Sequence, residues 1–160
     1  MCSYGTDEYI RRVVTTYSQM LLHVAMTRLH IPADAEDAVQ EVFLRLLTAR
    51  PRFRDAEHEK AWLIRATLNR ASDLCRTAER RNVPLEDAGT APEPPREDGS
   101  LLSAVQALPA KYSAVIHLYY YEGYSIKEIA SILHLPGPTV GTRLSRGREK
   151  LRNMLKEEEQ

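Results

Sequence analysis

The sequence is poor in the features that would point to a disulfide-bonded, metal-binding or membrane-inserted protein. Its only cysteines, Cys2 and Cys75, are too few and too far apart for a disulfide framework or a metal knuckle, and their scarcity suits a reducing cytosol. No apolar run approaches the roughly 20 residues that a membrane-spanning helix needs, and the first residues lack the basic-then-apolar pattern of a signal peptide. We therefore expect a cytoplasmic protein with no metal and no membrane insertion.

The chain also lacks an excess of charge of either sign. Twenty-two basic residues balance 22 acidic ones, so the net charge predicts neither a nucleic-acid nor a membrane partner. The distribution is uneven, however: residues 60–81 hold six basic and two acidic side chains, and residues 139–156 hold six basic and one acidic. The net charge of zero is therefore the sum of two cationic segments, an acidic linker and an acidic tail.

No catalytic or cofactor pattern is present. There is no glycine-rich loop that could cradle a phosphate, and no histidine has the companions that a metal site or a catalytic triad requires. Each of the five is most simply a surface or helix-end residue, namely His23, His30, His58, His117 and His134. We therefore expect no enzymatic activity and no cofactor.

Residues 82–100 differ in composition from the rest of the chain. They contain four prolines, two glycines, five acidic residues and one basic residue, and such a segment cannot bury much apolar surface. This composition predicts a flexible linker between a first domain at residues 1–81 and a second at residues 101–160. Each domain is near the lower size limit for folding alone.

Helical periodicity runs through everything outside the linker, and no alternation of polar and apolar residues predicts a strand, so we expect an all-α fold of two small helical domains. The first predicted helix has Thr6 as a candidate N-cap and the apolar residues Ile10, Val13, Val14, Tyr17, Leu21, Val24 and Ala25. The second opens at Pro32 and Asp34, ends at Pro51, and buries Ala35, Ala38, Val39, Val42 and Leu46. After the charged segment RFRDAEHEK, the third runs from about Ala61 to Arg80 and buries Ile64, Leu68, Ala71 and Cys75.

In the second domain we expect a short helix, a break near Pro109 and a longer helix that ends around Gly123. Ser125 and Glu128 fit a capping box at the start of the next helix, whose expected inner face is Ile126, Ile129, Ala130 and Leu133. Prolines at 136 and 138 remove amide donors, so the last helix is expected to start near Thr139.

That last helix has two contrasting faces. Val140, Leu144, Gly147, Leu151 and Met154 share one side, and Thr142, Ser145, Arg146 and Glu149 lie opposite. A short capped helix, a tight turn and a second helix with a polar outer face are typical of a helix-turn-helix that enters a major groove. The basic residues at its rim suit phosphates, and they are Arg143, Arg148, Lys150 and Arg152. The alternative is a solvated basic helix in an ordinary helical domain.

The third helix carries an unusual polar face, made of Trp62, Arg65, Asn69, Asp73 and Arg76. An aromatic ring, guanidinium groups and an amide suit a separated nucleic-acid strand, because they offer stacking, cations for phosphates and donors for a base edge. Alternatively, Trp62 is a core residue, and Arg65 or Arg76 pairs with Asp73.

These segments resemble the extracytoplasmic-function (ECF) sigma factors, the smallest members of the sigma-seventy class of bacterial RNA polymerase specificity subunits. DAEDAVQEVFLRL (34–46) resembles the family's polymerase-binding helix, and AWLIRATLNRASDLCR (61–76) resembles its promoter-opening helix. LPAKYSAVIHLYYYEGYSIKEIA followed by PTVGTRLSRGREKLR is similar to its fourth conserved region. Three positions depart from the family, which usually has glycine, a basic or polar residue, and alanine where this chain has Pro138, Gly141 and Gly147.

The resemblance implies a factor that binds core RNA polymerase, recognises two promoter elements and helps to separate the strands. Contacts with the clamp helices of the beta-prime subunit are implied for Asp37, Gln40 and Glu41, which otherwise form a solvated acidic turn that favours the helix dipole. Minus-ten contacts are implied for Phe53, Trp62, Arg65, Asn69 and Arg76. Asn69 and the loop from Phe53 to Glu59 would hold a flipped base.

In the second domain, the resemblance implies that Thr142, Ser145 and Arg146 read bases of the minus-thirty-five element. Phosphate contacts are implied for Lys127, Thr139, Arg143 and Arg148. The segment Tyr112–Tyr121 would offer a patch to the flap of the beta subunit, although a core role is expected for Tyr112, Val115 and Tyr119.

Other functions fit part of the sequence. A stand-alone helix-turn-helix repressor would use its first domain to dimerise or to sense a ligand. A helical adaptor or anti-sigma-like protein would tolerate the loss of Arg143, Arg146 and Arg148. Relatives are commonly held inactive by an anti-sigma factor, and the residues do not say whether this chain is.

Overall fold

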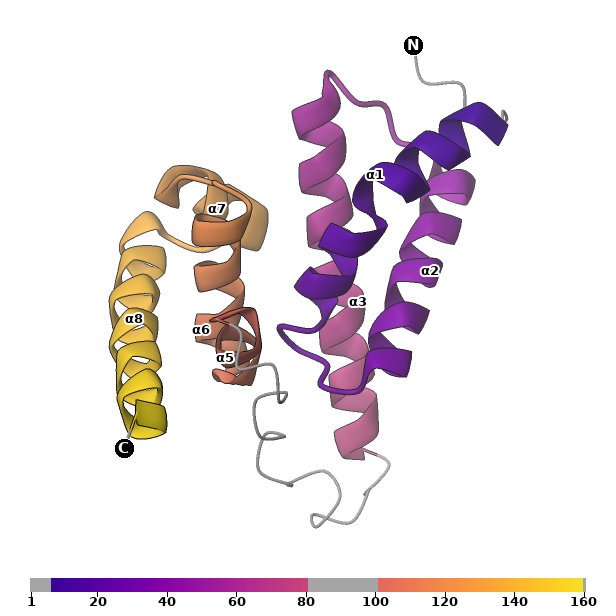
Figure 1. Ribbon diagram of the computed structural model, residues 1–160. Coiled ribbons are helices and arrows are strands. Elements are labelled where there is room, and N and C mark those ends of the chain that lie inside the picture. Colours follow the sequence, from indigo (N-terminus) through magenta and orange to yellow (C-terminus); the bar gives the residue numbers. More distant parts are fainter. Residues whose placement is uncertain (1–6, 81–100, 160) are drawn as a thin grey trace. The chain divides into compact units, whose positions relative to one another are not determined.

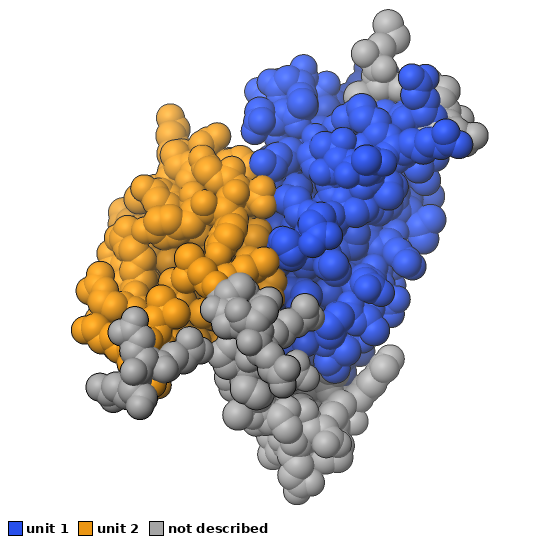
Figure 2. All heavy atoms as spheres, viewed as in Figure 1, with its two compact units in different colours: residues 1–77 blue, residues 78–160 orange. Residues whose placement is uncertain are grey.

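The computed structural model describes residues 7–80 and 101–159, and all regular structure in these ranges is helical (Figure 1). The chain divides into two compact units, Met1–Thr77 and Ala78–Gln160 (Figure 2). The all-α prediction is confirmed. Within the described ranges, no helix has both the length and the apolar character needed to cross a membrane. The predicted N-cap Thr6 and the predicted linker lie outside the described residues.

Unit 1 contains the helices α1 (Asp7–Ala25), α2 (Pro32–Ala49) and α3 (Ala56–Arg80). α2 starts as predicted, with a proline at its first turn, where a missing amide costs nothing. It ends at Arg50, which adopts a left-handed conformation (φ 46°) and donates its amide to the Leu46 carbonyl at 3.0 Å. The buried residues of α2 are the five that the sequence predicts.

α3 begins five residues earlier than the sequence predicts, at Ala56 rather than Ala61. The Asp55 carboxylate accepts the His58 amide at 2.8 Å, and the Asp55 carbonyl accepts the Glu59 amide at 3.2 Å. Asp55 therefore caps the helix. The prediction of a loop was wrong because the charged segment holds both a helix cap and a carboxylate that belongs to the core.

That carboxylate is Glu59, which is only 2% exposed. It accepts hydrogen bonds from the hydroxyls of Tyr9 at 2.9 Å and Tyr17 at 3.3 Å, and Arg12 Nη2 lies 3.0 Å from both of its oxygens. Burial, together with the nearby Glu59 charge, raises the pKa of Tyr17. A buried carboxylate needs such partners, and because all three come from α1, they fix the first turn of α3 against that helix.

Unit 2 contains α5 (Leu101–Ala107), α6 (Ala110–Ile116), the π-helix η1 (His117–Tyr121), α7 (Ile126–Leu133) and α8 (Gly137–Glu159). The predicted break near Pro109 is confirmed, and the helical segment ends just before Gly123, whose φ is +73°.

The prediction for Tyr119 was wrong, and of the two alternatives for His117, a surface residue or a helix-end residue, only the second holds, because His117 directly follows α6. His117 is 1% exposed, stacks on Tyr121 at 5.2 Å, and places Nε2 3.4 Å from Glu122 Oε2, so it is not a surface residue. Tyr119 is 36% exposed and not part of the core. The π-helical turn changes which side chains face inward, and a period of 3.6 residues does not predict this.

α7 starts with the predicted capping box. The Glu128 amide donates to Ser125 Oγ at 3.1 Å, and the Ser125 amide donates to Glu128 Oε1 at 3.0 Å. One part of its predicted inner face was wrong, because Ile126 is 39% exposed whereas Ile132 is buried beside Ile129. His134 closes the helix in a left-handed conformation, with φ 56°.

α8 begins at Gly137, two residues before the predicted start. The amides of Thr139 and Val140 donate to the Pro136 carbonyl at 3.1 and 3.2 Å. Pro138 therefore lies in the first helical turn, where its missing amide is tolerated. The predicted inner face is confirmed, with Val140, Leu144 and Gly147 buried and Leu151 and Met154 partly buried.

Gly147 explains one departure from the family. A Cβ atom there would lie 3.0 Å from Ile116 Cγ1 and 3.3 Å from Tyr112 Cβ. At Gly141, by contrast, a Cβ atom would meet nothing within 4 Å. Gly147 therefore lets α8 pack closely against α6. Close packing does not explain the glycine at position 141.

The Glu59 contacts predict a large local effect on stability. Glu59→Ala should lower the free energy of unfolding of unit 1 by about 3 kcal/mol, because three donors lose their acceptor. Glu59→Gln keeps an acceptor oxygen and should cost roughly half as much. Urea unfolding followed by the fluorescence of the single tryptophan, Trp62, measures the change. Glu57→Ala removes an exposed carboxylate from the same turn and should shift stability by less than about 0.5 kcal/mol; an equal loss in both variants would contradict the assigned role.

The two α8 glycines should respond differently to alanine. Gly141→Ala should stabilise the protein by up to about 1 kcal/mol, because glycine disfavours a helix interior. Gly147→Ala gains the same propensity but crowds Ile116, and we expect no net stabilisation. Ile116→Val should restore part of the gain in the Gly147→Ala background. The midpoints of urea unfolding followed by far-UV circular dichroism test this, and equal stabilisation by both single variants would show that the Ile116 contact does not matter.

Glu128 should make α7 sensitive to acid. The Ser125 amide lowers the pKa of Glu128 below its ordinary value of 4.5, so its contribution is present above that value and is lost as the pH falls through the lower, folded-state pKa. Between about pH 5.5 and pH 3, wild-type stability should therefore fall more steeply than that of Glu128→Gln. Glu149→Gln, an exposed carboxylate on α8, is the matched control. Parallel pH profiles for wild type and Glu128→Gln would contradict this role.

Candidate functional site

The polar face of α3 is present as predicted. Arg65, Asn69 and Arg76 are exposed, and Trp62 is partly buried at the start of the stripe. Arg76 forms an ion pair with Asp73, so the alternative of an internal pair holds for Arg76. No such pair with Asp73 is formed by Arg65. An exposed pair of this kind contributes little to stability, and Arg76 can exchange Asp73 for another anion.

The loop before α3 folds onto this stripe through an aromatic cluster. The Phe53 ring lies edge-on to both neighbouring rings, 5.3 Å from His58 and 5.9 Å from Trp62. The Arg54 amide donates to His58 Nδ1 at 3.1 Å. The structure therefore brings Phe53 and Trp62 together. His58, which lies inside the loop from Phe53 to Glu59 that the resemblance singles out, belongs to the same cluster.

The predicted polymerase-binding residues lie together on α2. Asp37, Gln40 and Glu41 are all exposed. Glu41 forms an ion pair with Arg70 of α3, which ties the two helices together. The pair is open to solvent on both sides, with exposed fractions of 46% and 39%, so it can also exchange.

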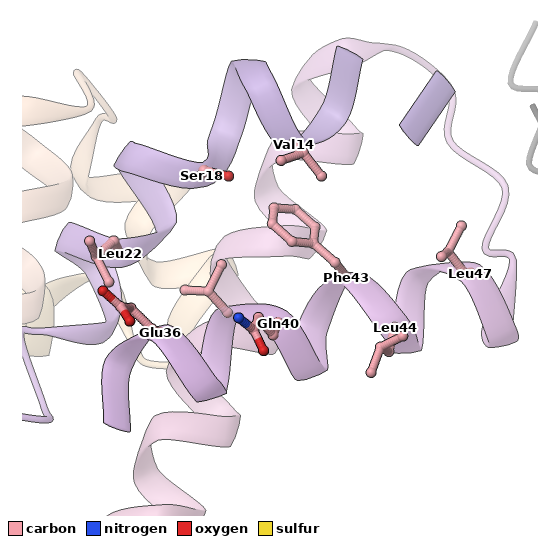
Figure 3. Close-up of a pocket in the computed structure, with 9 residues that line it drawn as sticks. Val14, Ser18, Leu22, Glu36, Gln40, Phe43, Leu44 and Leu47 are labelled. Carbon is pink, nitrogen blue, oxygen red and sulfur yellow. The ribbon is translucent and has the colours of Figure 1, made fainter. Parts of the chain in front are cut away.

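An apolar groove of about 520 Å³ runs between α1 and α2 beside these residues (Figure 3). Gln40 lines it, and Glu36 contributes a carboxylate. Leu44 is 62% exposed and Val14 is 37% exposed, which leaves apolar surface open to a partner. The lining residues are Val14, Ser18, Leu22, Glu36, Val39, Gln40, Phe43, Leu44 and Leu47. Sequence reasoning missed the groove because it gave Val14 only as one of the apolar residues of the first helix, whereas the groove forms where two helices meet.

The outer face of α8 is also as predicted. Thr142, Ser145 and Arg146 are exposed on the side opposite the buried stripe. Thr139 and Arg143 are partly buried on one flank, where a hollow of about 380 Å³ is also lined by Lys111 of α6. Cations and hydroxyl groups around a hollow suit a phosphate.

The other flank of α8 contains a larger hollow, of about 610 Å³. Arg148 lines it and donates from Nη1 to the Tyr120 hydroxyl at 3.0 Å. Gly141 lies in the same wall and leaves it open. Lys127 is exposed in the first turn of α7. Lys111 is not among the contact residues expected from the sequence, and Tyr120 was expected there only as part of the Tyr112–Tyr121 patch.

Two family models match the chain, one in each unit. Sigma-70 region 2 matches residues 13–81, and Sigma-70, region 4 matches residues 98–151. The first match covers α2, α3 and most of α1, and the second covers the helix-turn-helix. A stand-alone helix-turn-helix regulator would account for the second match alone, so that alternative is not supported.

Relatives of known class match across both units. The ECF RNA polymerase sigma factor SigW of Bacillus subtilis (strain 168) is 30% identical over 172 residues, which cover 96% of this chain and 92% of SigW. The probable RNA polymerase sigma factor RfaY of Xanthomonas campestris pv. campestris is also 30% identical, over 94% of this chain but only 41% of the relative.

Two solved structures have the same fold over nearly the whole chain. RpoE in complex with the anti-sigma factor NepR, from Bartonella quintana, gives a TM-score of 0.73 at 22% identity and covers 94% of this chain and 98% of RpoE. CnrH in complex with the cytosolic domain of CnrY gives 0.65 at 26% identity, over 95% of this chain and 90% of CnrH. With both conserved regions matched in order, and with the similarity to SigW spanning both units, the chain belongs to the ECF RNA polymerase sigma factors.

Proposed function

We propose that this sigma factor divides its work between the two units: residues 1–81 bind core polymerase and read the minus-ten element, and residues 101–160 read the minus-thirty-five element. Residues 82–100 act as the tether between them. Two weak DNA contacts joined by a tether bind well only when a third body fixes their spacing. We therefore expect the free protein to bind promoters poorly and core polymerase to make it a reader of both elements.

The polymerase contact is assigned to α2. Asp37, Gln40 and Glu41 offer acceptors to basic residues, and the apolar groove beside them offers surface to bury. An acidic edge next to an apolar groove suits a helical partner with arginines at its rim. The beta-prime clamp helices are the proposed partner here, and the flap of the beta subunit is the proposed partner of unit 2.

The minus-ten contact is assigned to the α3 stripe and its loop. Phe53 and Trp62 provide ring faces or edges for unpaired bases, and Asn69 provides both a donor and an acceptor. Arg65 and Arg76 are available for phosphates. The cluster of Phe53 against Trp62 supports this assignment, because it places the loop beside the exposed amide-bearing stripe.

The minus-thirty-five contact is assigned to α8. Thr142, Ser145 and Arg146 are proposed to meet base edges, and Lys127, Thr139, Arg143 and Arg148 to meet phosphates. The single observation that carries the proposal is the arrangement of α8. Its hydroxyl and guanidinium groups are exposed directly opposite Val140 and Leu144, which are 0% and 2% exposed and anchor the helix.

The proposed role is that of a binding factor without catalysis, acting in the cytoplasm, where its polymerase partner works. An anti-sigma factor is a further proposed partner, because RpoE is bound by NepR in a structure with the same fold. An adaptor function is disfavoured, since it gives no reason for the exposed basic face of α8.

Reconstituted transcription tests the proposal. Bacterial core polymerase plus this chain should produce new run-off start sites on a promoter library, and core polymerase alone should not. Arg146→Ala should lose roughly tenfold in discrimination at one minus-thirty-five position, and Arg143→Ala should weaken all promoters alike. Lys156→Ala, an exposed cation in the last turn of α8, is the control and should change neither. A folded protein that adds no start site, or an Arg146→Ala variant with unchanged base preference, would contradict the proposal.

A further inference from the structure

A hollow of about 380 Å³ lies where α6 meets the first turns of α8. Its polar lining consists of Lys111 and Tyr112 of α6 and Thr139, Thr142, Arg143 and Arg146 of α8. Lys111 is the one cation among them that lies outside the helix-turn-helix, which consists of α7 and α8. Thr142 and Arg146 also belong to the face of α8 that we propose meets base edges, so the hollow borders the proposed DNA-binding surface.

The cations around this hollow have no anionic partner. Lys111, Arg143 and Arg146 line it, and among the described residues no carboxylate does. Across residues 7–80 and 101–159, none of the three forms an ion pair, whereas three arginines of unit 1 each pair with a carboxylate. Like charges held close together repel one another, and an arriving anion relieves that repulsion. The charge of the hollow therefore favours an anionic ligand.

The Tyr112 ring holds Lys111 at the edge of the hollow. Nζ of Lys111 lies 5.1 Å from the centroid of this ring, and Nζ of Lys150 lies 5.7 Å from the same centroid. An aromatic face attracts a cation at such distances. Tyr112 itself is only 6% exposed, so the ring is fixed in the core of unit 2. It thus gathers one ammonium group from α6 and one from α8.

The close approach of α6 to α8 makes this arrangement possible. A Cβ atom at position 147 would lie 3.3 Å from Tyr112 Cβ. Because the residue there is glycine, Tyr112 packs directly against α8, and its neighbour Lys111 lies beside the α8 cations. Gly147 is one of the three departures from the family, so this two-helix hollow depends on a residue that is unusual among its relatives.

We propose that Lys111 and Arg143 hold a backbone phosphate of the promoter DNA in this hollow, beside the minus-thirty-five element. The hydroxyls of Thr139 and Thr142 make no hydrogen bond within the described part of the chain, and they can donate to phosphate oxygens. A DNA phosphate is favoured over a free phosphate ion because exposed charges hold a single ion weakly, whereas a bound strand brings its phosphates with it. The inference rests on the proposed function and adds a contact from outside the helix-turn-helix.

The salt dependence of promoter binding tests the role of Lys111. Holoenzyme is made from core polymerase and the full-length chain, and its affinity for promoter DNA is measured over a range of salt concentrations. Lys111→Gln should weaken binding about fivefold and reduce the slope of log affinity against log salt by about one, because one phosphate is no longer neutralised. Lys111→Arg keeps the charge and should retain most of both. Lys156→Gln, an exposed cation in the last turn of α8, should match wild type.

Modified DNA locates the contact. Each phosphate near the minus-thirty-five element is replaced in turn by an uncharged methylphosphonate. One replacement should weaken wild-type binding about fivefold and leave Lys111→Gln unaffected, because that variant has already lost the contact. The base preference of Lys111→Gln should equal that of wild type, since a phosphate carries no sequence information. The affinity of the free chain for core polymerase should also be unchanged.

Several results would overturn the inference. These are a Lys111→Gln variant with the wild-type affinity and salt slope, a loss of affinity for core polymerase in its place, or the absence of any methylphosphonate position that depends on Lys111. If inorganic phosphate stabilises the free wild-type chain against heat more than chloride of equal ionic strength, and does not stabilise Lys111→Gln, the site belongs to a free ion and not to DNA. A wild-type holoenzyme that binds promoters no better than unrelated DNA would contradict the proposed function itself.

Discussion

The burial of the Glu59 carboxylate is the constraint on which the start of α3 and the proposed DNA-binding stripe of unit 1 depend. Among the carboxylates that the structure describes, Glu59 is the one in the core, and an unpaired charge there would cost several kcal/mol. Tyr9, Arg12 and Tyr17 meet that charge from α1. These contacts join segments more than 40 residues apart and hold the first turn of α3 against α1, next to the Asp55 cap and the aromatic cluster.

Local signals predicted most of the fold. The buried residues of α2, the capping box of α7 and the inner stripe of α8 are all set by neighbours within a few residues, so periodicity and side-chain type were sufficient. The start of α3 could not be predicted in this way, because the partners that allow Glu59 to be buried come from another helix. His117 was missed for a related reason: the π-helical turn shifts the period at that point, and no residue in the sequence marks the shift.

The exposed helix faces of the candidate site could be predicted from the sequence, but the contacts between different helices could not. The exposed faces of α3 and α8 follow from helical geometry, which places Asn69 and Arg146 without any tertiary information. Phe53 and Trp62 were linked only through the family resemblance, and the structure adds the ring contacts. The α1–α2 groove and the Tyr120–Arg148 hydrogen bond depend on how different helices meet. Helical periodicity in a single sequence does not predict such contacts.

The close approach at Gly147 has a consequence for attempts to redirect promoter choice. Transplanting a recognition helix from a relative with alanine at this position would bring a methyl group to within 3.0 Å of Ile116 Cγ1. The hybrid would then have to tilt the grafted helix or move Ile116 on α6, and either change would shift the side chains that we propose meet the DNA. α6 and α8 therefore need to be exchanged together, so a successful chimera should carry both helices from the same parent.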